Sequence, residues 1–256
     1  MLEIIPLPAL KDNYIWLLKN KISRHVAIVD PSEAEPVLNV IKSESLIPIA
    51  IMITHHHWDH VGGIPGITEQ FDIPVYTPKI ETVAGSTNLV GEGDVVSLPE
   101  LPLNLEIMDV PGHTSGAVAY YTDDMVFSGD TLFTAGCGRM FEGTPPQMHA
   151  SLTKFKTLPD STLLYCGHEY TVSNLKFAAS VEPDNTAIQE RLRLAEETQN
   201  LNQPTVPATL AEEKQTNPFL RCEEPEVIAA ASQFSGKNLN EAADVFAAIR
   251  QWKDNF

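Results

Sequence analysis

The chain has 256 residues and carries 17 Lys and Arg against 34 Asp and Glu, which gives a formal charge of −17. A balance this acidic argues against a general nucleic-acid binder, because phosphate contacts require a basic face. The hydrophobic fraction of 43% and the charged fraction of 20% are typical of a globular protein with one large core, or with one domain and a smaller one.

No run approaches the ~20 apolar residues that a membrane helix requires, and the first residues lack the basic and apolar regions of an export signal. We therefore expect a cytoplasmic protein without a membrane partner. Cys137, Cys166 and Cys222 are widely spaced and match no zinc-ribbon or redox pattern, so we expect reduced, mostly buried thiols. We also expect a monomer.

The first two thirds of the chain contain short apolar, β-branched runs separated by Gly, Pro and Asp, a pattern typical of strands. The expected strands span 3–7, 14–18, 25–29, 48–54, 74–77, 95–98, 105–110, 118–122, 125–128 and 163–166. Asp30-Pro31-Ser32-Glu33 is typical of a helix start. Thr144-Pro145 begins another predicted helix, in which Met148, Leu152 and Phe155 recur at helical spacing.

After about residue 170 the pattern becomes helical. Thr209 and Glu212 are spaced as a capping box, and Asn217-Pro218 is expected to end the helix that they begin. Two apolar faces indicate further helices, one made by Ile188, Leu192 and Ala195 and the other by Leu239, Ala243, Phe246 and Ile249. We therefore expect a mixed domain over residues 1–167 and an all-α domain over residues 168–256.

The strongest chemical signal follows the apolar run that ends at Thr54, where the chain reads His55-His56-His57-Trp58-Asp59-His60. His55 and His57 are two apart in an extended segment, so they point to the same side. Clustered imidazoles and carboxylates at this density are typical of a metal site. The segment can serve two adjacent ions, with His55 and His57 on one and Asp59 and His60 on the other.

Three later strands repeat one arrangement, in which an apolar run ends at a glycine followed by a ligand-type residue. These residues are His113, Asp130 and His168. The carboxyl ends of neighbouring strands place residues at one edge of a sheet. Together with the first cluster they make five imidazoles and two carboxylates, enough for two ions of four or five ligands each.

At this point the chain resembles the metallo-β-lactamase-fold superfamily, whose His-x-His-x-Asp-His hallmark stands at residues 55–60. Further segments resemble one branch, the glyoxalase II family of hydroxyacylglutathione hydrolases. They are Gly-His-Thr-Ser-Gly at 112–116, Ser-Gly-Asp-Thr-Leu-Phe at 128–133, Gly-Cys-Gly-Arg at 136–139, Phe-Glu-Gly-Thr at 141–144, Cys-Gly-His-Glu-Tyr at 166–170 and Asn-Pro-Phe-Leu-Arg at 217–221. The resemblance runs from Tyr14 to Lys253 and includes the helical tail.

The resemblance implies an α+β fold, a four-layer αββα sandwich followed by an all-α C-terminal domain. It further implies two divalent metal ions, one held by His55, His57 and His113 and the other by Asp59, His60 and His168, with Asp130 bridging both. Family members accept zinc, iron or manganese, and nitrogen and oxygen ligands are compatible with all three.

The implied reaction is hydrolysis of the thioester S-D-lactoylglutathione, a 2-hydroxyacylglutathione, to D-lactate and glutathione, the second step of methylglyoxal removal. Asp59 and Asp130 are the expected catalytic carboxylates. A water shared by two ions loses a proton near neutral pH and then attacks the carbonyl carbon. The thiolate leaving group, whose pKa is about 8.5, requires no dedicated general acid.

The family's glutathione-contact positions are occupied here by Arg139, Phe141, Tyr170, Arg250 and Lys253. Arg139 stands where many relatives carry Lys, and Phe141 stands where others carry Tyr, so one hydroxyl contact to the substrate is expected to be absent. Arg250 and Lys253 are neighbours on one helix surface. Spacing alone favours a different interpretation, a solvated helix end whose basic residues interact favourably with the helix dipole.

Several assignments remain open. Asp30 is either the N-cap before Pro31 or a hydrogen-bond partner of a ligand histidine. We expect His56 to point away from the metals and Trp58 to pack. Within the fold the main alternative activity is a mononuclear-iron persulfide dioxygenase, against which the helical tail argues. A lactamase, an RNA-processing nuclease and a non-catalytic binding protein are less favoured.

Overall fold

Alternation along the strands makes the first sheet apolar on both faces. In the computed structural model, which describes residues 2–256, Ile15 and Leu17 of strand β2 (Asn13–Asn20) face one core while Trp16 and Leu18 face another. The sheet has the order β1 (Leu2–Ala9), β2, β3 (His25–Val29), β4 (Ile47–Met52), β5 (Val75–Pro78) and β6 (Asn88–Val90). Pairing is antiparallel from β1 to β3 and parallel from β3 to β6.

A second sheet packs on the first through a core that contains Trp16, Tyr120 and Phe127. Its order is β14 (Ala208–Thr209), β13 (Leu163–Cys166), β10 (Met125–Gly129), β9 (Val118–Tyr121), β8 (Leu103–Asp109) and β7 (Val95–Leu98). Strands β10 and β13 are parallel and the other neighbours are antiparallel.

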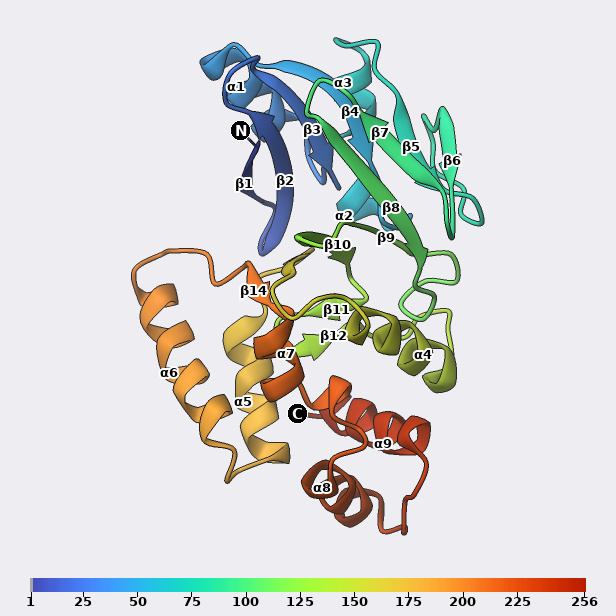
Figure 1. Cartoon of the computed structure of the whole chain (residues 1–256), viewed down its shortest axis with the longest axis vertical. Coiled ribbons are helices and arrows are strands. Elements are labelled where there is room, and N and C mark those ends of the chain that lie inside the picture. Colours follow the sequence, from blue (N-terminus) through green and yellow to red (C-terminus); the bar gives the residue numbers. More distant parts are fainter. Residues whose placement is uncertain (1) are drawn as a thin grey trace.

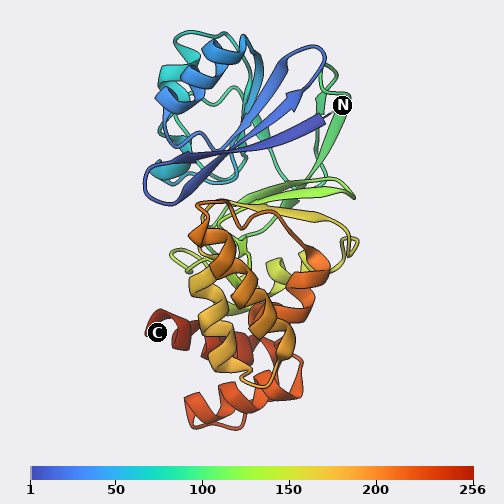
Figure 2. The same cartoon turned by 90° about the vertical axis from the view of Figure 1, so that its left-hand side faces the viewer.

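Helices cover both outer faces of the sheet pair (Figures 1 and 2). Val37 and Ile41 of α1 (Ala34–Glu44) and Ile64 and Ile67 of α3 (Ile64–Thr68) bury their side chains against the first sheet. On the second sheet, α4 (Pro145–Lys156) buries its own apolar stripe. The expected four-layer αββα sandwich is confirmed, since each sheet faces the other on one side and helices on the opposite side.

The C-terminal part of the chain is helical and lies below the sandwich in Figure 1. It comprises α5 (Thr171–Val181), α6 (Thr186–Asn200), α7 (Leu210–Thr216), the 3-10 turn η1 (Pro218–Leu220), α8 (Pro225–Ser235) and α9 (Ala242–Asp254). Apart from α6, one core joins these helices to α4 and the second sheet, with Phe155, Phe177, Phe219 and Phe246 among its members. Helix α6 packs on α5 in a separate cluster. The other helices therefore share a hydrophobic core with the sandwich.

Most of the predicted strands and helices are present, and two helices begin with capping boxes. Thr144 precedes α4 and Thr209 precedes α7, each in a capping box. Asn217 ends α7 as predicted. Leu239, however, lies before α9, so its assignment to the helical stripe was wrong, although the side chain still packs on the shared core.

The structure also contains elements that the sequence patterns did not reveal. Short strands β6, β11 (Leu132–Phe133), β12 (Gly136–Cys137) and β14 are two or three residues long, too short for alternation to be detected. The α-helices α5 and α8 were also missed. A two-residue strand within the helical part, β14, completes the edge of the second sheet beside β13.

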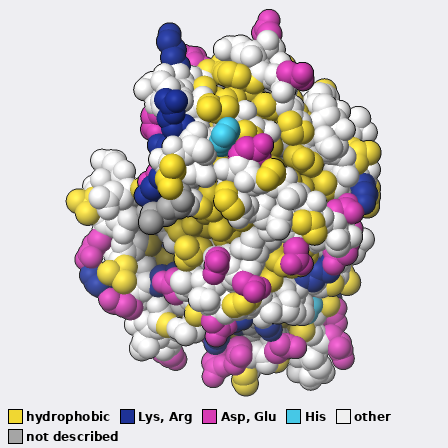
Figure 3. All heavy atoms as spheres, turned by 45° about the horizontal axis from the view of Figure 1, so that its top comes forward, with side chains coloured by type: hydrophobic (Ala, Val, Ile, Leu, Met, Phe, Trp, Pro, Cys, Tyr) yellow, Lys and Arg dark blue, Asp and Glu magenta, His cyan; other side chains and the backbone are white. Residues whose placement is uncertain are grey.

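The surface agrees with the acidic composition. Acidic side chains are scattered over the face drawn in Figure 3. No helix within residues 2–256 is long and apolar enough to cross a membrane. The three cysteines are buried free thiols in the described chain, and burial raises the pKa of Cys137 to about 11.

Candidate metal centre

Four strand ends deliver the predicted ligands to one place. The segment that carries His55 to His60 follows β4, and the short helix α2 (Trp58–Val61) holds Asp59 and His60. His113 follows β8, Asp130 follows β10 and His168 follows β13. Because the two sheets pack face to face, these ends meet at one edge of the sandwich.

The side chains form two clusters whose ligand atoms converge. His55, His57 and His113 make the first, and Asp59, His60 and His168 make the second, with the ligand atoms of each within 4.8 Å of one another. His57 Nδ1 lies 2.9 Å from His113 Nε2. His168 Nε2 lies 3.6 Å from Asp59 Oδ2. These are the two groupings that the resemblance implies.

Asp130 lies between the two clusters. Its Oδ2 is 3.5 Å from His113 Nε2 and 3.2 Å from His168 Nε2, and its Oδ1 is 3.3 Å from His60 Nε2. Gly129 precedes it with φ of 50°, and a Cβ there would lie 2.3 Å from Thr54 Oγ1. Only glycine allows the chain to pass Thr54 so closely.

Unpartnered buried atoms at the centre fit divalent ions. His55 Nε2, His60 Nε2 and Asp130 Oδ1 are buried and have no hydrogen-bond partner among the residues the structure describes. Buried polar atoms rarely remain unpaired, and imidazole nitrogen with carboxylate oxygen is a donor set typical of zinc, iron and manganese. The residues present therefore fit two divalent metals.

The remaining nitrogen of four ligand histidines is held by an oxygen. Thr54 Oγ1 lies 3.0 Å from His55 Nδ1, and Asp30 Oδ2 lies 3.0 Å from His60 Nδ1. The carbonyl oxygen of Arg139 accepts from His113 Nδ1 at 2.7 Å, and Asp12 Oδ1 lies 2.8 Å from His168 Nδ1. Such contacts fix the ring orientation and leave Nε2 available to a metal.

These contacts resolve the open question about Asp30. Helix α1 begins at Ala34 with Glu33 as its N-cap residue, so Asp30 does not cap it. Asp30 instead adopts φ of 49° and accepts hydrogen bonds from the backbone N–H of Thr54 at 2.8 Å and from Thr54 Oγ1 at 2.6 Å. It is a hydrogen-bond partner of the ligand segment.

Asp12, Asn13 and Thr54 were not predicted as site residues. Asn13 Nδ2 donates to the carbonyl oxygen and to Oδ2 of Asp59, both at 3.1 Å. Asp12 and Asn13 lie far from Asp59 and His168 in the sequence, and no spacing pattern connects them. Thr54 directly precedes the ligand segment, and this position in the sequence was the one signal that could have identified it as a site residue.

The electrostatics of the centre favour positive charge near Asp130. Burial lowers the pKa of His55 well below its usual value, with the His60 charge adding to the effect. Burial also acts to lower the pKa of His60, but Asp130 and Asp30 outweigh it and raise that pKa well above its usual value. Burial opposes ionisation of Asp130, yet His60 and His168 hold its pKa well below the usual range. A cation beside Asp130 is therefore stabilised by its carboxylate.

The two clusters form part of the wall of an open cleft of about 680 Å³. The cleft is lined by five predicted ligands, His57, Asp59, His113, Asp130 and His168, and by all five predicted glutathione contacts, Arg139, Phe141, Tyr170, Arg250 and Lys253. Tyr170 stacks on the His168 ring at 4.8 Å. The cleft thus joins the predicted metal ligands to cationic and aromatic side chains from α9 and from the segments after β12 and β13.

Two side chains of the cleft depart from expectation. Trp58 was expected to pack, but it is 70% exposed and lines the cleft, because α2 is a single turn with one side toward solvent. The spacing of Arg250 is typical of a solvated helix end, but only 4% of its surface is accessible. Its guanidinium donates to the Cys137 carbonyl oxygen at 2.8 Å and to Asp254 Oδ1 at 3.0 Å.

Lys253 is better placed to meet an anion in the cleft. Its ammonium donates to the Ser173 carbonyl oxygen at 3.3 Å and lies 5.3 Å from the centre of the Phe177 ring. Burial, with Arg250 close by, lowers the pKa of Lys253 to about 8. Arg139 is largely exposed and lies 3.4 Å from Asp254 Oδ1.

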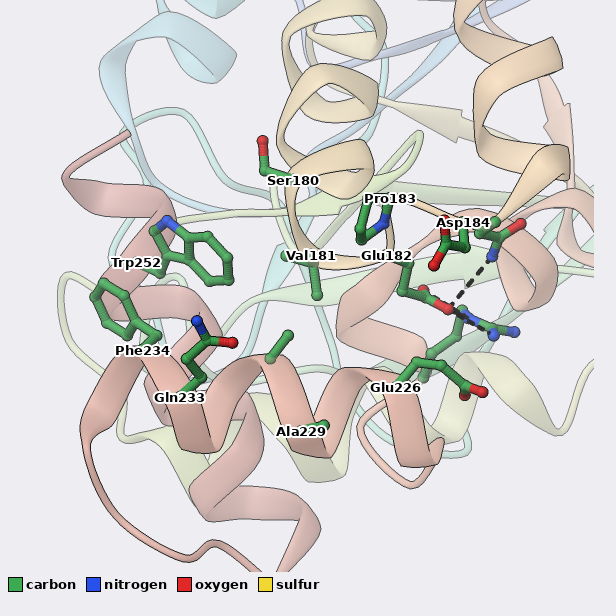
Figure 4. A pocket seen from close by; sticks show the side chains of 13 residues that line it. Ser180, Val181, Glu182, Pro183, Asp184, Glu226, Ala229, Gln233, Phe234 and Trp252 are labelled. Atoms are coloured by element: carbon green, nitrogen blue, oxygen red, sulfur yellow. Dashed lines mark hydrogen bonds and ion pairs between the residues drawn. The ribbon is translucent and has the colours of Figure 1, made fainter.

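A larger cavity, of about 800 Å³, lies between α8, α9, the end of α5 and the loop that leads to α6 (Figure 4). Glu182 and Arg221 form an ion pair at one end, and Phe234 and Trp252 stack at the other. Its described lining contains none of the predicted site residues. We therefore place the candidate active site in the smaller cleft at the sheet edge.

Comparisons with known proteins agree with this geometry. The model of the "Metallo-beta-lactamase superfamily" matches residues 13–168, and that of the "Hydroxyacylglutathione hydrolase C-terminus" matches residues 169–256. A hydroxyacylglutathione hydrolase of Nitrosomonas eutropha is 50% identical over 256 residues, and the match covers 100% of this chain and 100% of that one.

Two solved structures share the fold. ETHE1 from Myxococcus xanthus is 24% identical with a TM-score of 0.66, covering 99% of this chain and 98% of that one. The BLEG-1 B3 metallo-beta-lactamase is 25% identical with a TM-score of 0.65, covering 86% of this chain and 99% of that one. The structural likeness supports the sandwich, whereas the sequence relatives match both the sandwich and the helical part.

Proposed function

Because this chain belongs to the hydroxyacylglutathione hydrolase family, within the metallo-beta-lactamase superfamily, we propose that it hydrolyses S-D-lactoylglutathione to D-lactate and glutathione. One observation carries the proposal. A cleft at the sheet edge combines two ligand clusters around Asp130 with cationic side chains supplied by the helical part. The alternative persulfide dioxygenase has no comparable support, since likeness to ETHE1 at 24% identity extends to the fold alone.

The proposed metal ligands are the seven residues of the two clusters. His55, His57 and His113 would hold one ion, Asp59, His60 and His168 the other, and Asp130 would bridge them. When bound, a divalent pair supplies Lewis acidity toward a carbonyl oxygen and lowers the pKa of a nearby water. We propose zinc, iron or manganese, all of which suit nitrogen and oxygen ligands.

The carboxylates have a separate chemical role. We propose Asp59 and Asp130 as the catalytic residues, because carboxylate oxygens at the base of the cleft can accept hydrogen bonds from the attacking water and orient its lone pair toward the thioester carbon. Water adds to that carbon and its protons pass to the carboxylates and on to solvent. The carbon–sulfur bond then breaks, its electron pair stays on sulfur, and glutathione leaves as the thiolate. A thiolate with a pKa of about 8.5 leaves without a proton from the protein.

The glutathione part of the substrate carries carboxylates, which we propose are bound by the cations of the cleft. Lys253 and Arg139 are the direct contacts. Arg250 acts mainly by shaping the wall, because it is buried and already donates to Cys137 and Asp254. Tyr170 offers a hydroxyl group, and Phe141, which is 64% exposed, offers an apolar surface in place of the hydroxyl of a tyrosine.

The finer assignments belong to the same proposal. We propose a catalytic domain over residues 1–167 and a glutathione-binding domain over residues 168–256, in a monomeric, cytoplasmic protein that acts on a small molecule. Three buried thiols support a reducing compartment.

Metal analysis combined with a thioesterase assay tests the proposal. We expect purified protein to contain two equivalents of metal and to hydrolyse S-D-lactoylglutathione with release of free thiol. The proposal fails if the metal-loaded protein leaves this thioester intact. Oxygen consumption with glutathione persulfide and one equivalent of iron would identify the dioxygenase instead.

A further inference from the structure

His56 stands among the proposed ligands, but its two ring nitrogens lie beside carboxylates instead of beside Asp130. Nδ1 lies 3.1 Å from Glu81 Oε2, and Nε2 lies 3.2 Å from Glu142 Oε1. Both nitrogens therefore face carboxylates from segments distant in sequence. An ordinary surface histidine does not require two such partners.

Glu81 binds the loop that carries His113. Its side chain is only 1% exposed. Its Oε1 accepts from Thr114 Oγ1 and, at 3.1 Å, from the backbone N–H of Gly116. A buried carboxylate is costly unless it is paired. The second oxygen, Oε2, accepts no hydrogen bond among the described residues, and His56 Nδ1 lies within ion-pair distance of it.

Glu142 binds the same loop from the other side. Its Oε2 accepts from the backbone N–H of Ser115 at 2.8 Å. The neighbouring Phe141 N–H donates to the carbonyl oxygen of His113 at 3.1 Å. Residues 113–116 are thus held between two carboxylates, and the His56 ring joins those carboxylates to the segment that carries His55 and His57.

We propose that His56 is a positioning residue, which through Glu81 and Glu142 fixes the His113 loop against the His55–His57 segment and so sets the geometry of the first metal position. It does not contact the metal. The second position, made by Asp59, His60 and His168, lies outside this network. The inference rests on the proposed metal centre. It predicts that loss of His56 weakens metal binding at the first position more than at the second.

A stepwise metal titration tests this prediction. Full-length apoprotein is titrated with Zn²⁺ against a competing chelator, and with Co²⁺ followed by visible absorption. His113→Ala identifies the step that belongs to the first position, and His168→Ala identifies the other. We expect His56→Ala to weaken the His113-dependent step by about 10- to 100-fold and to leave the other step unchanged, with an altered Co²⁺ spectrum.

Further variants separate positioning from general stability. Glu142→Gln, at the exposed end of the network, should weaken the same step, and it serves as the test if His56→Ala does not fold. Combining it with His56→Ala should add little, because both act on one network. His56→Gln should recover part of the affinity. His25→Ala is the matched control, since His25 contacts Ser23 rather than the site.

The outcomes are distinct. Equal affinities in His56→Ala and the parent protein, or equal weakening of both steps, would overturn the inference. A parent protein that binds two ions but leaves the thioester intact would contradict the proposed function while leaving this inference in place. A parent protein that binds fewer than two ions would contradict both the metal centre and the inference.

Discussion

Asp130 is the residue on which both ligand clusters depend, because its two oxygens lie within 3.5 Å of ligand nitrogens from each. We predict that Asp130→Ala lowers bound metal to one equivalent or less and reduces kcat on the order of 10³-fold or more. Elemental analysis and steady-state kinetics measure both effects. Asp124→Ala, on an exposed turn, is the control. Two equivalents of metal with near-normal turnover would exclude Asp130 from the centre.

Lys253 provides a pH test of the substrate-binding role. Its pKa is lowered to about 8, first by burial and then by Arg250, so the ammonium is present below pH 8 and is lost as the pH rises through that value. An anionic substrate requires the charged form. We therefore predict that KM is constant near pH 7 and rises above pH 8, while kcat is unaffected by this group.

The matched variant removes the titration. Lys253→Met should raise KM at pH 7 by about tenfold, and KM should then no longer depend on the ionisation of this residue. Lys237→Met, on an exposed loop outside the cleft, should behave like the parent protein. An unchanged rise of KM above pH 8 in Lys253→Met would assign that rise to another group.

At the scale of elements, the helical part supports the active-site wall. Asn217, which is fully buried, donates to the carbonyl oxygens of Phe133 and Gly136 in the β11–β12 hairpin at 3.2 and 3.0 Å. It also donates to Glu213 Oε2 at 2.9 Å. The hairpin leads directly to Arg139, whose carbonyl oxygen holds His113. A turn between two helices thus braces a ligand loop of the sandwich.

Asn217→Ala should be strongly destabilising, because it removes a donor from the buried carbonyl oxygens of Phe133 and Gly136 and one of the two donors to Glu213 Oε2. We predict a loss on the order of 3 kcal/mol in the free energy of unfolding, measured by urea denaturation. Asn238→Ala, at an exposed loop position, should change stability by less than about 0.5 kcal/mol. Equal stability of the two variants would show that the hairpin does not depend on Asn217.

Helix α9 is both a core element and part of the cleft. Val245, Phe246 and Ile249 are fully buried, and burial of each contributes about 1.5–3 kcal/mol. Arg250 directly follows Ile249, and Lys253 lies one turn beyond Ile249 on the same helix. Deletion of α9 would therefore expose the shared core as well as remove the proposed substrate contact Lys253, so single substitutions are the sharper test of binding.

At the scale of the whole molecule, the charge of −17 opposes an anionic substrate, while the cations of the cleft attract it at short range. Raising ionic strength from ~0.01 M to ~0.15 M shortens the Debye length from about 30 Å to about 8 Å, which screens distant charges more than direct contacts. We predict that kcat/KM of the parent protein changes little or rises over this range.

A double variant isolates the two contributions. In Arg139→Ala/Lys253→Ala the close attraction is lost while the global repulsion remains, so kcat/KM should be lower at low salt and should rise clearly with salt. The comparison uses S-D-lactoylglutathione with both proteins at each ionic strength. Parallel salt responses and equal rates at low salt would show that neither side chain faces the substrate.

The sequence by itself determined most of the strands, the change to a helical pattern after about residue 170 and the chemical character of the site. Strands such as β2 and β3 alternate apolar side chains toward two cores, and a period of two is a local property of a strand. The ligand-type residues were recognisable because they follow strand ends and are adjacent in the chain, as in His55 to His60. Family resemblance added the four-layer arrangement and the substrate-binding role of the cations in the helical part.

Only the tertiary structure decided which groups surround those residues. Asp12 meets His168 across 156 positions of sequence, Glu81 and Glu142 meet at His56, and Arg250 is buried against Cys137 rather than exposed on a helix end. Trp58 lines the cleft, although it was expected to pack. Asp30 binds the ligand segment, a role that its local pattern left open. Spacing along a chain records the period of a helix or strand, whereas a hydrogen bond between distant segments depends on how layers pack, which no local pattern contains.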